Sequence, residues 1–153
     1  MRRTLFILFL TLALPALAAS VLRSARESIK KGSNLAGTEK TLLAEAVKPS
    51  TTHADQAECY RLAAECNRKL HDQQNVKLYL KQQFDTVQFY ATLLNVFRQL
   101  ELCDSVDSVP NAQGKVRLSY KGRTHSLRMK HRRNIFNGGT FFLGKKDYAS
   151  AYS

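Results

Sequence analysis

The sequence predicts an α+β fold, and three features of its 153 residues indicate it. Residues 54–103 contain neither Gly nor Pro and carry apolar side chains at helical intervals, which is typical of helices. From Lys115 onward apolar and polar residues alternate, which is typical of strands. Asn137-Gly138-Gly139 lies between two apolar runs, as the turn of a β-hairpin does. We therefore expect a helical N-terminal and central region followed by a small antiparallel β region of one or two hairpins.

Residues 1–18 have the pattern of a secretory signal peptide. Arg2 and Arg3 precede an apolar run, and the chain then has the small-residue cleavage motif Ala16-Leu17-Ala18. The apolar run is far shorter than the ~20 residues that span a bilayer. We expect a secreted protein whose mature chain begins at Ala19 and forms one domain.

The next two segments are predicted to be helical. Residues 19–53 favour two short helices or a mobile arm, because Gly32 and Pro49 each end an amphipathic run. Residues 54–109 are predicted to form the helical core, as one long helix or as an αα-hairpin. The polar run at residues 71–75 is the expected turn between its arms.

Residues 110–153 are predicted to form a basic β-hairpin region. Val116, Leu118 and Tyr120 alternate with polar residues, and a second alternating run covers residues 125–130. A second hairpin would turn at residues 137–139. Such strands must pair with each other or lie on the helices, because an isolated hairpin is marginal in water.

Positive charge is concentrated in the same C-terminal region. The formal net charge is +12, and from residue 110 onward ten Lys or Arg face a single acid, Asp147. A solvated strand face explains this pattern as well as a binding surface does. As a binding surface it would contact a protein partner of unknown identity, or an anionic glycan, nucleic acid or membrane surface. The candidate binding residues are Lys115, Arg117, Lys121, Arg123, Arg128, Lys130, Arg132 and Arg133.

Cys59, Cys66 and Cys103 are candidates for disulfides in an oxidising compartment, and their odd number leaves one thiol over. Seven residues apart on one helix, Cys59 and Cys66 would lie about 10 Å apart along its axis, beyond the reach of a disulfide. A bridge from either to Cys103, an intermolecular disulfide and a free thiol stay open. The spacing matches no zinc pattern, so we expect no metal site and no cofactor.

Catalysis has little support in the sequence, which has no nucleophile elbow, HExxH motif or P-loop. His125, Arg128 and His131 can be drawn into a ribonuclease-like arrangement, but exposed strand histidines explain them equally well. We therefore do not expect an enzyme.

The patterns together favour a small secreted, non-enzymatic interaction protein that binds its partner through the basic C-terminal surface. Host-directed effectors are a frequent class among small secreted chains, and we take that class as the expectation. The alternative is a secreted precursor. Cleavage after the basic pair Arg132-Arg133 and at Gly144-Lys145-Lys146 would release an amidated peptide of residues 134–143.

Overall fold

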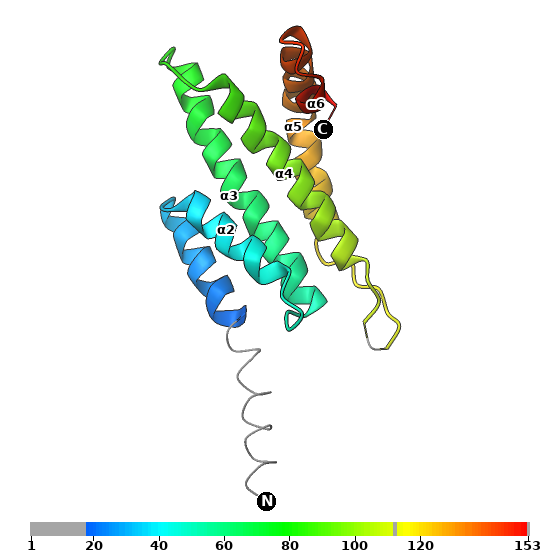
Figure 1. Ribbon diagram of the computed structural model, residues 1–153. Helices are drawn as coiled ribbons and strands as arrows, with labels where there is room; N and C mark the ends of the chain where they lie inside the picture. Colours follow the sequence, from blue (N-terminus) through cyan, green and yellow to red (C-terminus); the bar gives the residue numbers. More distant parts are fainter. Residues whose placement is uncertain (1–17, 112, 153) are drawn as a thin grey trace, which may run out of the picture.

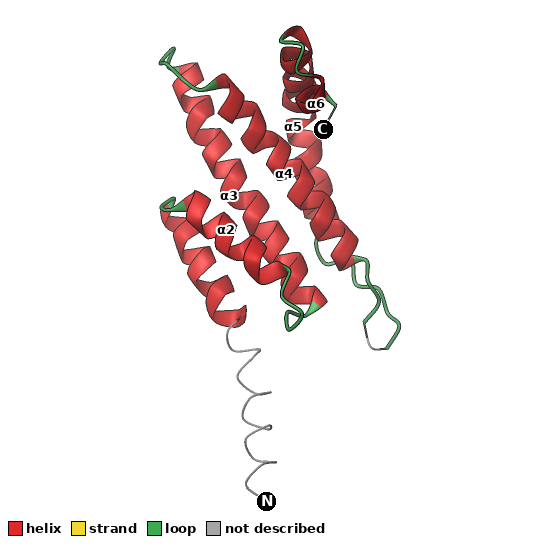
Figure 2. Ribbon diagram, viewed as in Figure 1, coloured by secondary structure: helices red, strands yellow, loops and turns green. Residues whose placement is uncertain are grey.

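The computed structural model describes residues 18–111 and 113–152, and every regular element in these ranges is a helix (Figures 1 and 2). A first helix spans residues 18–31. It is followed by α2 (Leu35–Ala46), α3 (His53–Tyr79), α4 (Thr86–Asp107), α5 (Lys121–Gly144) and α6 (Tyr148–Ala151). The α+β prediction is therefore wrong, since the described part of the chain has no strand. The predicted signal peptide falls almost entirely outside the described residues.

α3 and α4 form an antiparallel hairpin that runs the length of the molecule (Figure 1). The first helix and α2 cover one half of α3, and α5 lies beside α4. α6 folds back onto the end of α5. The main core lies between the first helix, α2 and α3. Its buried members are Leu22, Ala25, Ile29, Leu35, Leu42, Ala46, Cys59, Leu62, Ala63 and Cys66.

The structure has helices at 18–31 and at Leu35–Ala46 in the segment for which we expected short helices or a mobile arm. The chain turns between them through Gly32 and Asn34, which have φ values of 69° and 48°. These left-handed conformations suit Gly and are tolerated by Asn. The two helices can therefore fold against each other with a connection of three residues.

The predicted turn at residues 71–75 is wrong, because α3 continues through this run to Tyr79. His71 is only 1% exposed and its ring packs on Phe89, with ring centroids 4.2 Å apart. The chain instead turns between α3 and α4, where Lys81 has a φ of 54° and Asp85 caps α4 by accepting a hydrogen bond from the Gln88 N–H. A polar run with one buried member forms a helical face as readily as it forms a turn.

The predicted β-hairpin region at 110–153 is also wrong. Residues 115–118 are exposed, irregular chain, residues 119–120 form a bend, and α5 follows from Lys121 to Gly144. The buried positions of α5 are Thr124, His131, Gly138 and Phe142, spaced seven, seven and four residues apart, which is a helical period. Gly138 is not a turn residue, because a Cβ atom there would lie 2.8 Å from the Tyr90 ring. It lets α5 approach α4 closely.

Three buried or half-buried polar side chains join α2, α3 and α4. Asn67 and Gln99 each donate a side-chain N–H to the same oxygen of Glu39, at 2.6 Å. Asn67 also donates to the Gln99 side-chain oxygen at 3.1 Å. A satisfied network of this kind fixes how the three helices align.

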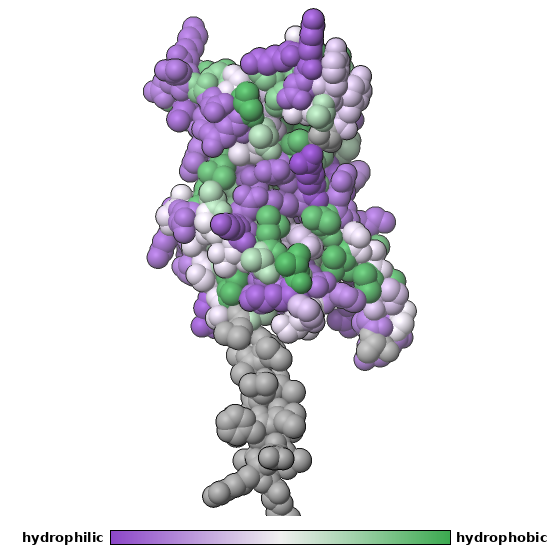
Figure 3. Space-filling view, in the orientation of Figure 1, coloured by the Kyte–Doolittle hydropathy of each residue, from purple (hydrophilic) through white to green (hydrophobic). Residues whose placement is uncertain are grey.

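The surface seen in the orientation of Figure 1 is largely hydrophilic, with hydrophobic patches over α2 and the lower half of α4 (Figure 3).

Candidate binding site

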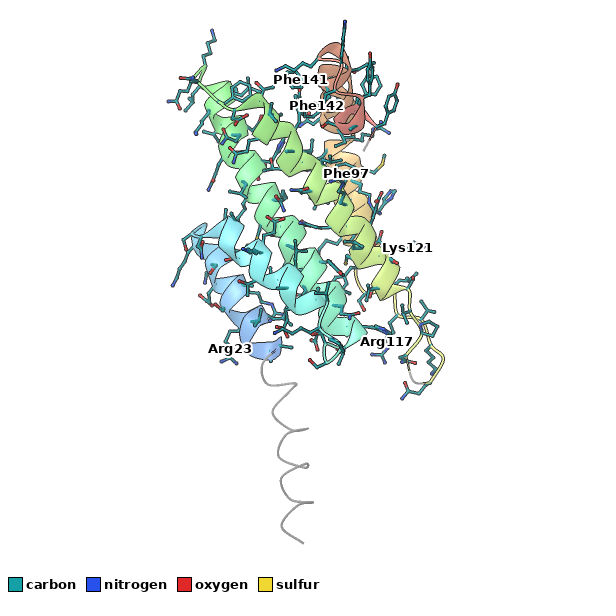
Figure 4. All side chains as sticks on the ribbon, in the orientation of Figure 1. Arg23, Phe97, Arg117, Lys121, Phe141 and Phe142 are labelled. Atoms are coloured by element: carbon teal, nitrogen blue, oxygen red, sulfur yellow. The ribbon has the colours of Figure 1, made fainter. Side chains whose placement is uncertain are left out.

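The eight cations that the sequence singles out do not form one strand face. Lys115 and Arg117 lie in the exposed loop before α5, and the other six lie on α5 itself. Figure 4 shows Arg117 beside this loop, while Phe141 and Phe142 lie at the far end of α5. Because a helix turns 100° per residue, residues seven apart share a face. Arg123 and Lys130 therefore share one face of α5, and Lys121 and Arg128 share another.

Arg128 has a structural contact. Its guanidinium pairs with the Asp104 carboxylate of α4 at 2.6 Å, and the Thr124 hydroxyl donates to the other oxygen of the same carboxylate at 2.7 Å. The Tyr120 N–H donates to the Asp107 carboxylate at 2.9 Å. These bonds hold the first turns of α5 on the end of α4. Within the described residues, none of the other seven cations makes an ion pair.

A groove of about 240 Å³ lies between α3 and α5. Leu100 of α4 and Leu127 of α5 line it, and both belong to a small apolar cluster with Ala64 and Val96. Its charged lining is Arg61 and Glu65 from α3 with Arg123 and Lys130 from α5. The groove thus combines an apolar floor with a charged rim.

The charges on the α3 side of the groove are already compensated. Arg61 donates two hydrogen bonds to Glu58, at 2.6 and 2.7 Å, and Arg68 donates two to Glu65, at 2.9 and 2.6 Å. Burial opposes ionisation of Glu58, but the bonds and charge of Arg61 hold its pKa below its ordinary value. Burial likewise opposes ionisation of Glu65, but the hydrogen bonds and charge of Arg68 hold the pKa of Glu65 below its ordinary value. The uncompensated charge at the rim is therefore that of Arg123 and Lys130.

α3 meets α5, or the residue before it, at two places that flank the groove. At one end the Arg61 guanidinium lies 5.7 Å from the centroid of the Tyr120 ring. At the other, the His71 and His131 rings meet edge to face with centroids 5.7 Å apart. Residues 61 and 71 are separated by about 15 Å along a helix axis. The groove, or slot, lies between these two contacts along the helices.

The histidine pair is buried and uncharged at neutral pH. His71 Nδ1 lies 3.1 Å from the Phe89 carbonyl oxygen, to which it donates in the neutral tautomer, while His131 Nε2 is buried without a hydrogen-bond partner. Burial lowers the pKa of His71. Burial lowers the pKa of His131 as well, and the charges of His71, Lys130 and Arg68 lower it further. Sequence reasoning placed His71 in a turn and missed the pair, because nothing local to either residue brings α3 and α5 together.

The three cysteines are free and buried. Burial raises the pKa of each thiol to about 12. Cys59 and Cys66 lie on the continuous helix α3, which keeps them apart as the spacing requires. An intermolecular disulfide stays a prediction, and it would require the fold to open first.

The residues of the precursor hypothesis lie in or beside α5. Arg132 and Arg133 are exposed in the middle of the helix, and residues 134–143 continue it. Gly144 is its last residue, and Lys145 follows with its Nζ 4.7 Å from the centroid of the Phe141 ring. Release of the peptide would require α5 to unwind.

The ribonuclease-like grouping of histidines is not brought together. His125 is exposed on α5, whereas His131 is buried against His71, and six residues place them on different sides of the helix. In the described ranges no group of three or more His, Cys, Asp or Glu is placed to hold a metal ion. None of the helices in the described part of the chain is both long and apolar enough to span a bilayer.

Comparisons of the chain with models of protein families, with curated proteins and with solved structures found no match.

Proposed function

We propose that this protein is a small secreted, non-enzymatic interaction protein that captures an acidic segment of a partner protein on the cationic surface of α5. The carrying observation is that Arg123, Lys130, Arg132 and Arg133 are exposed on one helix and make no ion pair with any described residue. Unpaired cations on a rigid helix attract an acidic chain and raise its rate of association.

A protein partner fits the site better than a uniform polyanion does. Two of these cations, Arg123 and Lys130, flank a groove with an apolar floor, formed by Leu100 and Leu127. Phosphate and sulfate groups gain nothing from an apolar floor, whereas protein interfaces combine an apolar centre with a polar rim. Arg is also well suited to binding carboxylates, through two parallel hydrogen bonds.

The test compares two variants of equal net charge. In the first, Arg123, Lys130, Arg132 and Arg133 are changed to Gln; in the second, the exposed Arg23, Lys30, Lys31 and Lys40 are changed to Gln. The second set lies on the first helix and α2, away from α5; Figure 4 labels Arg23 there. The probe is a fluorescein-labelled peptide of eight Glu around a central Ser, and its binding is followed by fluorescence anisotropy at increasing NaCl.

We expect the wild-type protein and the second variant to bind equally, with an affinity that falls as salt rises. The first variant should lose affinity by about four- to several-hundred-fold, because an exposed charge pair contributes about 0.2–1 kcal/mol and four are removed. Equal loss in both variants would mean that net charge alone attracts the peptide. Tighter, salt-dependent binding of a duplex DNA or of heparin by the same residues would reject a protein partner.

A further inference from the structure

The groove between α3 and α5 has features that a cationic surface alone does not require. Its floor is apolar, and its only uncompensated charges are the two cations on the α5 side. A salt-dependent surface for acidic chains would work equally well without a slot beneath it.

We infer that this groove seats one bulky apolar side chain of the acidic partner segment, while Arg123 and Lys130 bind carboxylates on either side of it in the sequence. The inference rests on the proposed function and names the recognition motif for it. Charge complementarity selects the occupant: the seven-residue spacing places the two cations about 10 Å apart along α5, with Leu127 between them.

The dimensions of the slot agree with such an occupant. Its volume of about 240 Å³ is below the range of pockets that enclose small molecules, which begin at roughly 300 Å³. It is large enough for a Leu or Phe side chain. Leu100 is 2% exposed and therefore forms a fixed floor, whereas Leu127 is half-buried and lines the groove from α5.

The anchoring should appear as a difference between two peptides of equal charge. The probes are the eight-Glu peptide with Ser at its centre and the same peptide with Leu at that position. Burying a Leu side chain is expected to make the second peptide bind the wild-type protein about ten- to hundred-fold more tightly.

Ser126→Trp is the variant that tests the groove. Ser126 is exposed and lines the groove, so an indole at that position fills the slot without removing any cation. His125→Trp is the matched control, because His125 is exposed on another side of the same helix turn and does not line the groove. We expect Ser126→Trp to bind both peptides with the affinity that the wild-type protein has for the Ser peptide. His125→Trp should keep the preference for Leu.

The outcomes separate this inference from the proposed function. If the wild-type protein binds both peptides equally, the anchoring is wrong and the cationic surface stands. If it binds neither peptide, both proposals are wrong.

Methyl NMR spectra of the wild-type protein give a second measurement that needs no variant. Saturable shifts of the Leu100 and Leu127 methyl groups with the Leu peptide support the inference, and their absence overturns it. Displacement of the Leu peptide by dodecanoate at lower concentration than by unlabelled Leu peptide would make the groove a lipid site and overturn it as well.

Discussion

Lowering the pH from 7 to 5 is expected to destabilise the fold through His71 and His131. Both imidazoles are buried, and burial lowers the pKa of each below the ordinary value of 6.5. The unfolded chain therefore takes up protons that the folded chain does not. The stability that the fold has while both histidines are neutral is fully present above pH 6.5. It is lost as the pH falls below that value toward the pKa of each histidine in the folded protein.

Neighbouring cations lower the pKa of His131 further. His131 faces the cations Lys130 and Arg68, and the nearest acid, Asp72, is itself paired with Arg68. From α4 the pair meets the Phe89 carbonyl, which already accepts from His71 Nδ1. A proton on His131 Nε2 would have no acceptor, because that atom has no hydrogen-bond partner. The folded state therefore resists protonation of both rings.

The size of the effect follows from proton linkage. If the folded protein takes up no proton at these two sites at pH 5, each histidine costs about 2 kcal/mol of unfolding free energy relative to pH 7. The pair then costs at most about 4 kcal/mol, a large part of the 5–15 kcal/mol typical of a small domain. Glu58 and Glu65 do not contribute in this window, because their lowered pKa values remove stabilisation only below their ordinary value of 4.5.

Urea unfolding at a series of pH values measures this loss, with His131→Leu as the test and the exposed His125→Gln as the control. His131→Leu removes one titrating group and an unpartnered nitrogen, so it should at least halve the loss between pH 7 and pH 5. His125→Gln should leave the loss unchanged. If wild type and His131→Leu lose stability equally over this range, the histidine pair is not the cause and the reasoning fails.

Two further predictions concern packing and thiol chemistry. Gly138→Ala should lower the unfolding free energy, because overpacking against the Tyr90 ring costs about 1–3 kcal/mol and the gain in helix propensity is only about 1 kcal/mol. Gly122→Ala, where nothing lies within 4 Å of a new Cβ, should be neutral or stabilising by up to about 1 kcal/mol; equal effects in thermal unfolding would contradict the close α4–α5 approach. In native protein a thiol reagent should label none of the cysteines rapidly, since they are buried and the pKa of each is about 12, whereas all three should react in urea. Rapid native labelling, or a disulfide in a peptide map of the folded protein, would show that the thiols are arranged differently.

The helical core could be predicted because its signal is local. Residues 54–103 have apolar positions at helical intervals with no Gly or Pro to break them, and the structure has α3 and most of α4 there. The turn could not be placed in the same way. All five residues of the run at 71–75 are polar, and the packing of His71 against Phe89, a residue 18 positions away, is not visible in the local sequence.

The β prediction failed because two periods coexist in the same residues. His125, Leu127 and Met129 alternate with polar residues as a strand does, but in α5 only Leu127 of the three is partly buried, and Met129 is 46% exposed. The buried positions of α5 are Thr124, His131, Gly138 and Phe142, and only Phe142 is strongly apolar. A hydropathy pattern does not reveal a helical face that has one strongly apolar position among four, whereas the alternation at residues 125–130 predicts a strand.

Only the charged part of the candidate site could be predicted from the sequence. Arg123 and Lys130 could be selected from charge alone, but the groove beside them needs Arg61, Leu100 and Leu127 from three different helices. No local signal relates these residues, because the contacts that bring them together run between α3, α4 and α5.

The weak amphipathic character of α5 also bears on how the site would work. A helix with few apolar core residues gains little from its own sequence, and most of its stability must come from packing. α5 packs on α4 and α6 and meets α3 through the two contacts that flank the groove. A ligand seated in the groove would touch both α3 and α5, and so it would stabilise the docked helix by binding only that state. Amide exchange of α5 should therefore slow on adding the Leu peptide, while exchange in the first helix and α2 should stay unchanged; equal slowing throughout would indicate that the peptide stabilises the whole fold without acting on α5.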